Sequence, residues 1–321
     1  MLAAGFTRIG AADVLEVIEL PEPGPGPGEV LIRVAAATVN PADTLLRKGQ
    51  IPYVTAPLPH VGGLECAGTI ARTGPASRWQ VGSRVAAITT FIPGGIGAHA
   101  QFVVVPDDSA AEIPAGLDMA AAATVPMSGL TAQLAVDRAI AGGARRIAVT
   151  GAGGAVGAFA IELAREAGLE TFGVVRPAYA VRARALGTNH VIDADADWNA
   201  AIRTIVPEGV DAVIDCALLG EATLGAIRDG GALITVRGFA GELTRGIVAT
   251  PVSVRDYERE QGKLKRLLRL AGEGRLHVFV HQTLPFTDAA EAHRLVEMGG
   301  LGGRVLLSFD REDADGDADG S

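Results

Sequence analysis

The feature that most constrains the fold is a glycine-rich turn between a strand-like segment and a helix-like one. Residues 146–150 read as a buried strand, and residues 155–168 place apolar side chains on one face of a helix. Gly151, Gly154 and Gly157 have the spacing of a dinucleotide-binding fingerprint, and the strand and the helix provide the context that this motif requires.

The three glycines have different predicted tasks. Gly151 permits a tight turn, Gly154 lets the backbone approach a pyrophosphate, and Gly157 lets the helix and the strand pack closely. The N–H groups and the dipole at the start of the helix then hold the phosphates. A glycine-rich turn without a ligand is the alternative. The predicted cofactor-binding residues of this segment are Gly151, Ala152, Gly153, Gly154, Ala155, Val156 and Gly157.

The chain around this turn predicts an α/β fold of two parts. Strand-like and helix-like segments alternate from residue 146 to residue 236, which is typical of a doubly wound parallel sheet. The first hundred residues instead show short β segments separated by Gly and Pro. Since 321 residues correspond to roughly two domains, we expect a catalytic domain of residues 1–122 and 259–309 and a nucleotide-binding domain of residues 123–258.

Several helix ends can be predicted locally. Asp118 is expected to cap a helix that begins at Met119, and Asp288-x-x-Glu291 has the pattern of a capping box. Residues 264–271 repeat leucine and alanine with helical spacing, beside lysines and arginines. These basic residues could meet a phosphate, but an exposed helix face is the better interpretation. A last strand is expected at residues 304–309.

Composition argues against nucleic acid and membrane partners. The net charge is −9, and an acidic tail of residues 310–319 contributes −5 of it, which leaves −4 for the body of the chain. We interpret this tail, residues 310–321, as disordered and solvated, although it contains Asp315-x-Asp317-x-Asp319-Gly320, which is the opening of a calcium loop. There is no basic stripe with interleaved aromatics, no long apolar run and no signal-peptide pattern, and two cysteines cannot form a disulfide framework. A cytoplasmic protein is therefore expected.

The second strand of the nucleotide-binding segment indicates which dinucleotide is bound. A site for NAD usually has an acidic residue at the end of this strand, to bind the ribose 2′-hydroxyl. Here the strand ends in Arg176, and Arg182 follows; a guanidinium suits a 2′-phosphate. NADP(H) is therefore the predicted cofactor, with a solvated turn arginine as the alternative interpretation of Arg176.

The motifs together resemble the medium-chain dehydrogenase/reductase superfamily, in its zinc-free quinone oxidoreductase branch. The resemblance covers the chain up to the acidic tail. The segments that carry it are residues 27–34, 39–44, 47–49, 63–68, 82–85 and 129–132, the fingerprint, and residues 213–216, 230–234 and 303–307. It implies a GroES-like β domain, a Rossmann domain, an active site between them and a homodimer.

The resemblance also implies roles for individual residues. Asn40 and Asp43 would face the nicotinamide and the substrate, Thr131 would lie near the nicotinamide, and Arg304 would contact the cofactor. Tyr53 falls in a loop where relatives often carry an aromatic residue, and it could donate a proton, or it could only pack the loop. The catalytic candidates are thus Asn40, Tyr53 and Thr131, and the cofactor-binding candidates outside the fingerprint are Asp43, Thr131, Arg176, Arg182, Gly238, Phe239 and Arg304.

The same resemblance bears on metal binding. Zinc-dependent relatives have cysteine where this chain has Asn40, and Gly-His-Glu where it has Gly63-Leu64-Glu65. Leucine cannot bind zinc, and a catalytic zinc needs three protein ligands, so no metal is expected. Glu65 is expected to organise the turn beneath the cleft, and Cys66 to be a small packing residue.

The predicted activity is therefore hydride transfer from NADPH to a quinone or to an α,β-unsaturated carbonyl. Two alternatives remain open from the sequence. One is an enoyl-thioester reductase on the same scaffold. The other is a non-enzyme that binds NADP(H) as a redox sensor or interaction module.

Overall fold

The computed structural model describes residues 1–52, 54–89 and 96–309. The predicted Tyr53 site and the predicted acidic tail therefore lie outside the described residues. The strands are β1 (Leu2–Phe6), β2 (Glu16–Glu19), β3 (Glu29–Val39), β4 (His60–Val61), β5 (Glu65–Thr73), β6 (Arg84–Ile88), β7 (Phe102–Pro106), β8 (Ala110–Glu112), β9 (Arg146–Thr150), β10 (Glu170–Val175), β11 (His190–Asp193), β12 (Val210–Asp215), β13 (Ile227–Thr235), β14 (Val248–Pro251), β15 (Val280–Pro285) and β16 (Arg304–Ser308). The α-helices are α1 (Pro41–Arg47), α2 (Met119–Ala123), α3 (Val125–Ala141), α4 (Ala155–Glu166), α5 (Ala180–Ala185), α6 (Trp198–Ile205), α7 (Gln261–Gly272) and α8 (Ala289–Met298). Short 3-10 turns are η1 (Ala12–Val14), η2 (Asp107–Ser109), η3 (Pro177–Tyr179), η4 (Gly220–Ala226), η5 (Val254–Asp256) and η6 (Phe286–Asp288).

A parallel sheet with helices on both faces confirms the predicted α/β class. Its strand order is β11-β10-β9-β12-β13-β14, and every neighbouring pair is parallel. Ile147 and Val149 of β9 join the core beneath α3 and α4, whereas Ala148 between them joins the core beneath α6. This alternation buries both faces of the sheet, as expected where helices cover each side.

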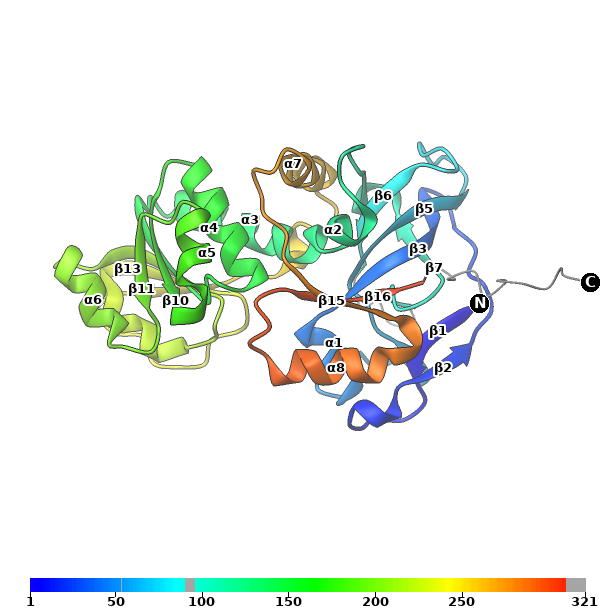
Figure 1. Ribbon diagram of the computed structural model, residues 1–321, viewed down its shortest axis with the longest axis horizontal. Helices are drawn as coiled ribbons and strands as arrows, with labels where there is room; N and C mark the ends of the chain where they lie inside the picture. Colours follow the sequence, from blue (N-terminus) through cyan, green and yellow to red (C-terminus); the bar gives the residue numbers. More distant parts are fainter. Residues whose placement is uncertain (53, 90–95, 310–321) are drawn as a thin grey trace, which may run out of the picture.

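The rest of the chain forms two sheets beside the parallel one, which are antiparallel except for the parallel pair β15 and β16 (Figure 1). In the larger sheet the order is β15-β16-β3-β5-β6-β8, with β7 also paired to β3; a second sheet has the order β2-β1-β4. The chain leaves the first part after β8, builds the parallel sheet and returns through β15 and β16. The division after residues 122 and 258 stays a prediction, which this strand order supports.

Helix starts show where local patterns succeed and fail. Asp118 caps α2 as predicted, because its carboxylate accepts the Ala121 N–H at 2.7 Å. The capping box predicted at Asp288 is wrong: Asp288 precedes α8 but makes no side-chain cap bond, because the chain enters α8 from the turn η6 rather than from an extended residue. The sequence prediction missed α1, where the Asp43 carboxylate accepts the Asn40 N–H at 2.7 Å.

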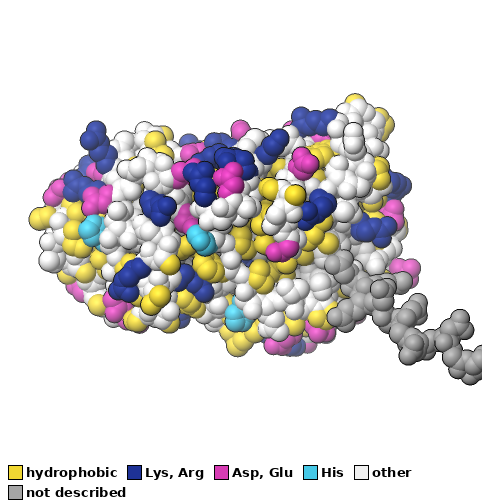
Figure 2. Space-filling view, turned by 45° about the horizontal axis from the view of Figure 1, so that its top comes forward, with side chains coloured by type: hydrophobic (Ala, Val, Ile, Leu, Met, Phe, Trp, Pro, Cys, Tyr) yellow, Lys and Arg dark blue, Asp and Glu magenta, His cyan; other side chains and the backbone are white. Residues whose placement is uncertain are grey.

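The basic residues of α7 lie on the surface, as the exposed-face interpretation expects. The four apolar residues with helical spacing are buried, while Lys263 and Arg266 pair with Asp137 and Glu166 across to α3 and α4. Figure 2 shows basic and acidic side chains intermixed on this face. In the described part of the chain, no helix is both long and apolar enough to cross a membrane.

Candidate functional site

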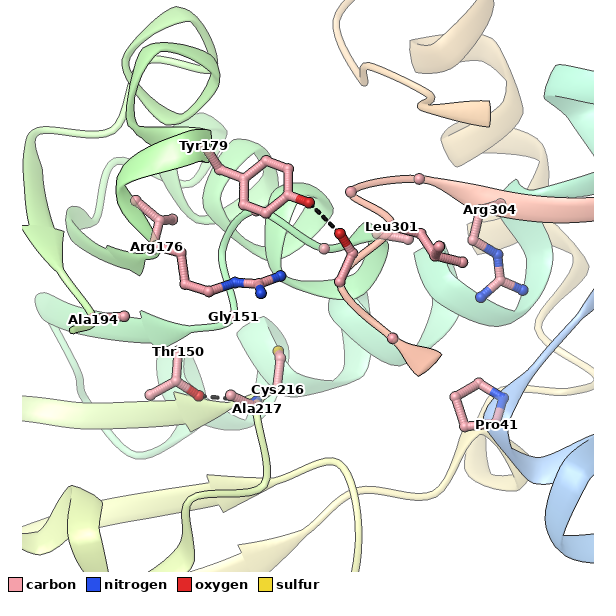
Figure 3. Close-up of a pocket in the computed structure, with 18 of the residues that line it drawn as sticks. Pro41, Thr150, Gly151, Arg176, Tyr179, Ala194, Cys216, Ala217, Leu301 and Arg304 are labelled. Atoms are coloured by element: carbon pink, nitrogen blue, oxygen red, sulfur yellow. Dashed lines mark hydrogen bonds between the residues drawn. The ribbon is translucent and has the colours of Figure 1, made fainter. Parts of the chain in front are cut away.

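A cavity of about 670 Å³ lies where the carboxyl ends of β9, β10 and β12 meet the first residues of β16. Ligands of open parallel sheets bind at this edge, outside the carboxyl ends of the strands. The nucleotide-binding side contributes the turn after β9, and the other side contributes Pro41, Arg304 and the loop from Gly299 to Gly303 (Figure 3). Both parts of the fold therefore build this site.

The turn after β9 fits a dinucleotide. Gly151 has a φ of +61°, which glycine adopts without strain. A Cβ on Gly157 would lie 2.3 Å from the Gly151 carbonyl oxygen, so only glycine lets α4 start this close to the strand. Among the described residues, no side chain caps α4 at Gly154 and none accepts from the first N–H groups of the helix, so these groups are available to phosphate oxygens. Of the predicted residues, Gly151, Gly153, Gly154 and Ala155 line the cavity; Ala152, Val156 and Gly157 do not, and Ala152 is fully buried.

The two predicted arginines of the nucleotide site are placed differently. Arg176 directly follows β10 and lines the cavity, and its guanidinium makes no ion pair with any described residue. Arg182 does not line the cavity; it donates to the carbonyl oxygens of Gly302 and Gly153 and lies over the ring of Phe279 at 4.0 Å. Only Arg176 is thus available to a ligand in this conformation.

Tyr179 completes this corner of the cavity. Its hydroxyl donates to the Gly300 carbonyl oxygen, and Figure 3 shows its ring above the Arg176 guanidinium. The distance from the Arg176 guanidinium carbon to the ring centroid is 5.5 Å. The contact ties the β10–α5 corner to the loop that closes the other side of the cavity.

The floor of the cavity is fixed by a buried carboxylate. Asp215, at the end of β12, accepts the Thr150 hydroxyl at 2.6 Å and the Gly220 N–H at 2.8 Å, and Thr150 in turn accepts the Ala217 N–H at 3.0 Å. Cys216 lines the cavity between them. Burial, and then the Asp215 carboxylate, raises the pKa of the Cys216 thiol, so the thiol is protonated at neutral pH.

The opposite end of the cavity contains a buried ion pair. Arg304 is 9% exposed and Glu65 is fully buried; Arg304 Nη2 lies 2.6 Å from Glu65 Oε1. The same Nη2 lies 2.7 Å from Thr38 Oγ1 and 2.7 Å from Asn40 Oδ1. The strand order brings these residues together, because β3 carries Thr38 and pairs with β16 on one side and β5 on the other.

The predicted donors near this end are already engaged. Asn40 Nδ2 lies 3.1 Å from Thr38 Oγ1 and 3.3 Å from Glu65 Oε1, so both of its N–H groups have acceptors. The Thr131 hydroxyl donates to the Met127 carbonyl oxygen one helical turn earlier, at 2.7 Å. Neither side chain lines the cavity.

The remaining predicted residues lie around the cavity rather than in its wall. Asp43 is buried and accepts the N–H groups of Asn40 and Gly63, each at 2.7 Å, so it shapes the turn before β5. Gly238 and Phe239 follow β13, outside the cavity wall, and the Phe239 ring packs near Gly220.

The residues at metal-ligand positions have other partners. Leu64 belongs to an apolar cluster with Phe6, Val14 and Leu46. Glu65 Oε1 accepts from Thr38, Asn40 and Arg304, and Oε2 accepts the Met127 N–H at 2.7 Å. Burial, and then Glu65, raises the pKa of the Cys66 thiol to about 12. Across the described ranges no group of three or more His, Cys, Asp and Glu side chains could hold a metal ion.

The sequence prediction missed much of the cavity wall. Tyr179, Cys216, Ala217, Leu219 and the loop Gly299–Gly303 line it without having been predicted. The glycine run of this loop was a signal visible in the sequence, and Gly299, Gly300 and Gly302 all adopt positive φ in the structure. Nothing in the sequence indicated that it faces Tyr179.

Comparison with known proteins shows which family of proteins this chain resembles. The alcohol dehydrogenase GroES-like domain model matches residues 26–115, and the zinc-binding dehydrogenase model matches residues 186–307. A quinone oxidoreductase of Pseudomonas aeruginosa is 30% identical, over 94% of this chain and 98% of its own length. An NADPH-dependent alkenal/one oxidoreductase of Arabidopsis thaliana, chloroplastic, is 26% identical, over 96% of this chain and 79% of its own length.

The solved structures agree with this fold. An alcohol dehydrogenase superfamily protein from Novosphingobium aromaticivorans superimposes with a TM-score of 0.85 at 27% identity, covering 97% of this chain and all of that one. The antiparallel part of the chain is thus GroES-like and the parallel part Rossmann-like, as predicted. The chain belongs to the medium-chain dehydrogenase/reductase superfamily, in its quinone oxidoreductase branch.

Proposed function

We propose that this protein is a zinc-independent reductase that uses NADPH to reduce quinones and α,β-unsaturated carbonyls. The observation that carries the proposal is the cavity itself, which joins a dinucleotide turn at one end to a buried guanidinium at the other. A bound nicotinamide cofactor supplies a hydride. The protein supplies orientation, exclusion of water and hydrogen bonds to the acceptor.

Zinc independence is supported by the chemistry of the residues at the ligand positions. Both oxygens of Glu65 already accept hydrogen bonds, and a neighbouring arginine balances its charge. Leu64 offers no donor atom, and the Cys66 thiol stays protonated at neutral pH because of its raised pKa. A divalent cation would have to compete with Arg304 for the same carboxylate.

The preference for NADPH over NADH is supported by Arg176. It lies at the end of the second strand of the sheet, where an acid would favour the 2′-hydroxyl of NAD. Its guanidinium lines the cavity without a carboxylate partner among the described residues. A 2′-phosphate would provide the missing anion.

Because the proposed mechanism uses no metal ion as a Lewis acid, the acceptor must already be electrophilic. A carbonyl conjugated to a double bond or a quinone ring accepts a hydride without metal activation, whereas the oxidation of a simple alcohol lacks this assistance. The names of the related quinone and alkenal/one oxidoreductases point to the same substrates. Asn40 and Thr131 remain our candidates at the reacting end, together with Tyr53, which lies outside the described residues.

The test is turnover with a panel of acceptors. Purified protein, NADPH and small quinones or enones should show loss of reduced-nicotinamide absorbance, unchanged after treatment with a chelator. Activity with enoyl-thioesters alone would favour the enoyl-thioester reductase. Tight binding of NADPH without oxidation by any acceptor would favour the non-enzymatic redox sensor.

We also propose that the chain is a cytoplasmic homodimer. The outer edge of β14 is unpaired among the described strands, and Val248 on it is 59% exposed, so pairing with a second copy would cover a free sheet edge. Light scattering gives the mass of the particle in solution. A monomer at micromolar concentration contradicts the dimer.

A further inference from the structure

The buried guanidinium of Arg304 is held from one side only. Its Nη2 reaches Glu65, Thr38 and Asn40 at 2.6–2.7 Å. Its Nη1 has no hydrogen-bond partner among the described residues, and Arg304 lines the cavity. Figure 3 shows Arg304 on the same side of the cavity as Pro41. Arg304 is therefore a buried cation whose two Nη1 N–H groups can donate hydrogen bonds to a ligand in the cavity.

Other donors at this end of the cavity are turned away from it. The N–H groups of Asn40 have acceptors in Thr38 and Glu65, and the Thr131 hydroxyl is used within α3. The Asn40 and Gly63 main-chain N–H groups both bind Asp43. Among the described residues, Nε and Nη1 of Arg304 are thus the side-chain donors at this end without a partner; Nε is buried, so Nη1 is the one that a ligand in the cavity can reach.

The position of Arg304 along the cavity indicates what it meets. The phosphates belong at the start of α4, and the 2′-phosphate end belongs at Arg176 on the β10 side. The other half of the dinucleotide must therefore extend toward Pro41 and Arg304. The acceptor has to lie against that half for a hydride to reach it.

We propose that Arg304 is a catalytic residue whose Nη1 donates a hydrogen bond to the acceptor oxygen that becomes negatively charged on reduction. This inference rests on the proposed function. When a hydride adds to the conjugated carbon, the π electron pair moves to the carbonyl oxygen, giving an enolate or a quinolate. Arg304 keeps its proton, because guanidinium does not ionise near neutral pH, and solvent supplies the proton that neutralises the product.

The surroundings of Arg304 suit this role. Glu65 anchors the guanidinium through Nη2, so the cation needs no reorganisation as charge develops on the acceptor. Arg304 and Glu65 are both buried, and a fixed charge acts more strongly in such surroundings than it does in solvent. Removal of one such donor typically lowers kcat by about 10²–10³-fold.

A pair of variants separates catalysis from structural support. Arg304→Gln leaves Glu65 as an uncompensated buried carboxylate and is expected to lower Tm, whereas Glu65→Gln/Arg304→Gln removes both charges and should recover most of that loss. We expect both variants to show kcat lower by at least about 100-fold, with the Kd of NADPH changed by less than about threefold. Arg72→Gln, in β5 of the same sheet and paired with the exposed Glu22, is the matched control and should leave kcat and Kd unchanged.

A binding measurement tests the donor without turnover. In the presence of NADP⁺, 4-nitrophenolate serves as a stable mimic of the developing oxyanion, and its visible absorbance reports binding. The wild-type protein should bind it at least about tenfold more tightly than Glu65→Gln/Arg304→Gln does, as expected for one charge-assisted hydrogen bond.

The possible outcomes are distinct. Equal nitrophenolate affinity in the two proteins overturns the inference, as does recovery of kcat in the double variant, which would make Arg304 only a partner for Glu65. A loss confined to the Kd of NADPH would make it a cofactor anchor instead. If no acceptor is reduced by the wild-type protein but nitrophenolate binding still depends on Arg304, the proposed function fails while the anion-binding role of Arg304 stands.

Discussion

The substitution Arg176→Ala should abolish the preference of the protein for NADPH over NADH. A hydrogen bond to a charged group contributes about 1.5–3 kcal/mol. Arg176 is exposed at the edge of the cavity, so solvent screening places its contact with a 2′-phosphate at the lower end of that range. About 1.5 kcal/mol corresponds to roughly a tenfold rise in the Kd of NADPH. The Kd of NADH, which has no 2′-phosphate, should not change.

The assay is a titration of each protein with NADPH and NADH, followed by nicotinamide fluorescence. Arg184→Ala is the matched control, because Arg184 is also exposed on α5 but does not line the cavity. Raised salt should reduce the preference of the wild-type protein, since an exposed charge pair is screened. If Arg176→Ala weakens NADPH and NADH equally, or affects neither, the assignment of the 2′-phosphate to Arg176 is refuted.

Three further predictions follow from single contacts. Gly157→Ala should lower Tm and weaken NADPH binding, because the added Cβ would lie 2.3 Å from the Gly151 carbonyl oxygen and overpacking costs about 1–3 kcal/mol. Gly262→Ala is the control, since its Cβ would meet nothing within 4 Å. Equal effects of the two substitutions would contradict the argument. Burial raises the pKa of the Glu162 carboxyl group despite its hydrogen bond to His277, so the folded protein binds this proton more tightly than the unfolded chain does. Protonation of Glu162 therefore stabilises the folded state below pH 4.5, and this contribution is lost as the pH rises through the folded-state pKa. Urea unfolding should therefore show the Glu162→Gln variant gaining stability relative to the wild type over that rise, and a constant difference would disprove it. Cys216, with its raised pKa, should be alkylated by iodoacetamide much more slowly than a free thiol at neutral pH, and more slowly still with NADPH bound; mass spectrometry gives the rates, and fast labelling unaffected by NADPH would argue against this cavity as the cofactor site.

The sequence by itself determined the parts of the protein whose physics is local. The turn after β9 was predictable because a strand, three spaced glycines and a helix are consecutive in the chain. The bounds of β9 were predicted to the residue, since this strand is a short apolar run between turn residues. Arg176 was predictable for the same reason, as the residue that directly follows β10.

Only the tertiary structure decided which side chains meet at the far end of the cavity. Glu65 and Arg304 are 239 residues apart in the sequence. They pair because β5 and β16 lie on either side of β3, in registers that bring their first residues close together. The same packing gives acceptors to the N–H groups of Asn40 and leaves Nη1 of Arg304 free. Tyr179 and Gly300 likewise meet across 121 residues. Strand order and register arise from the burial of whole faces, so no local pattern of residues could have specified these partners.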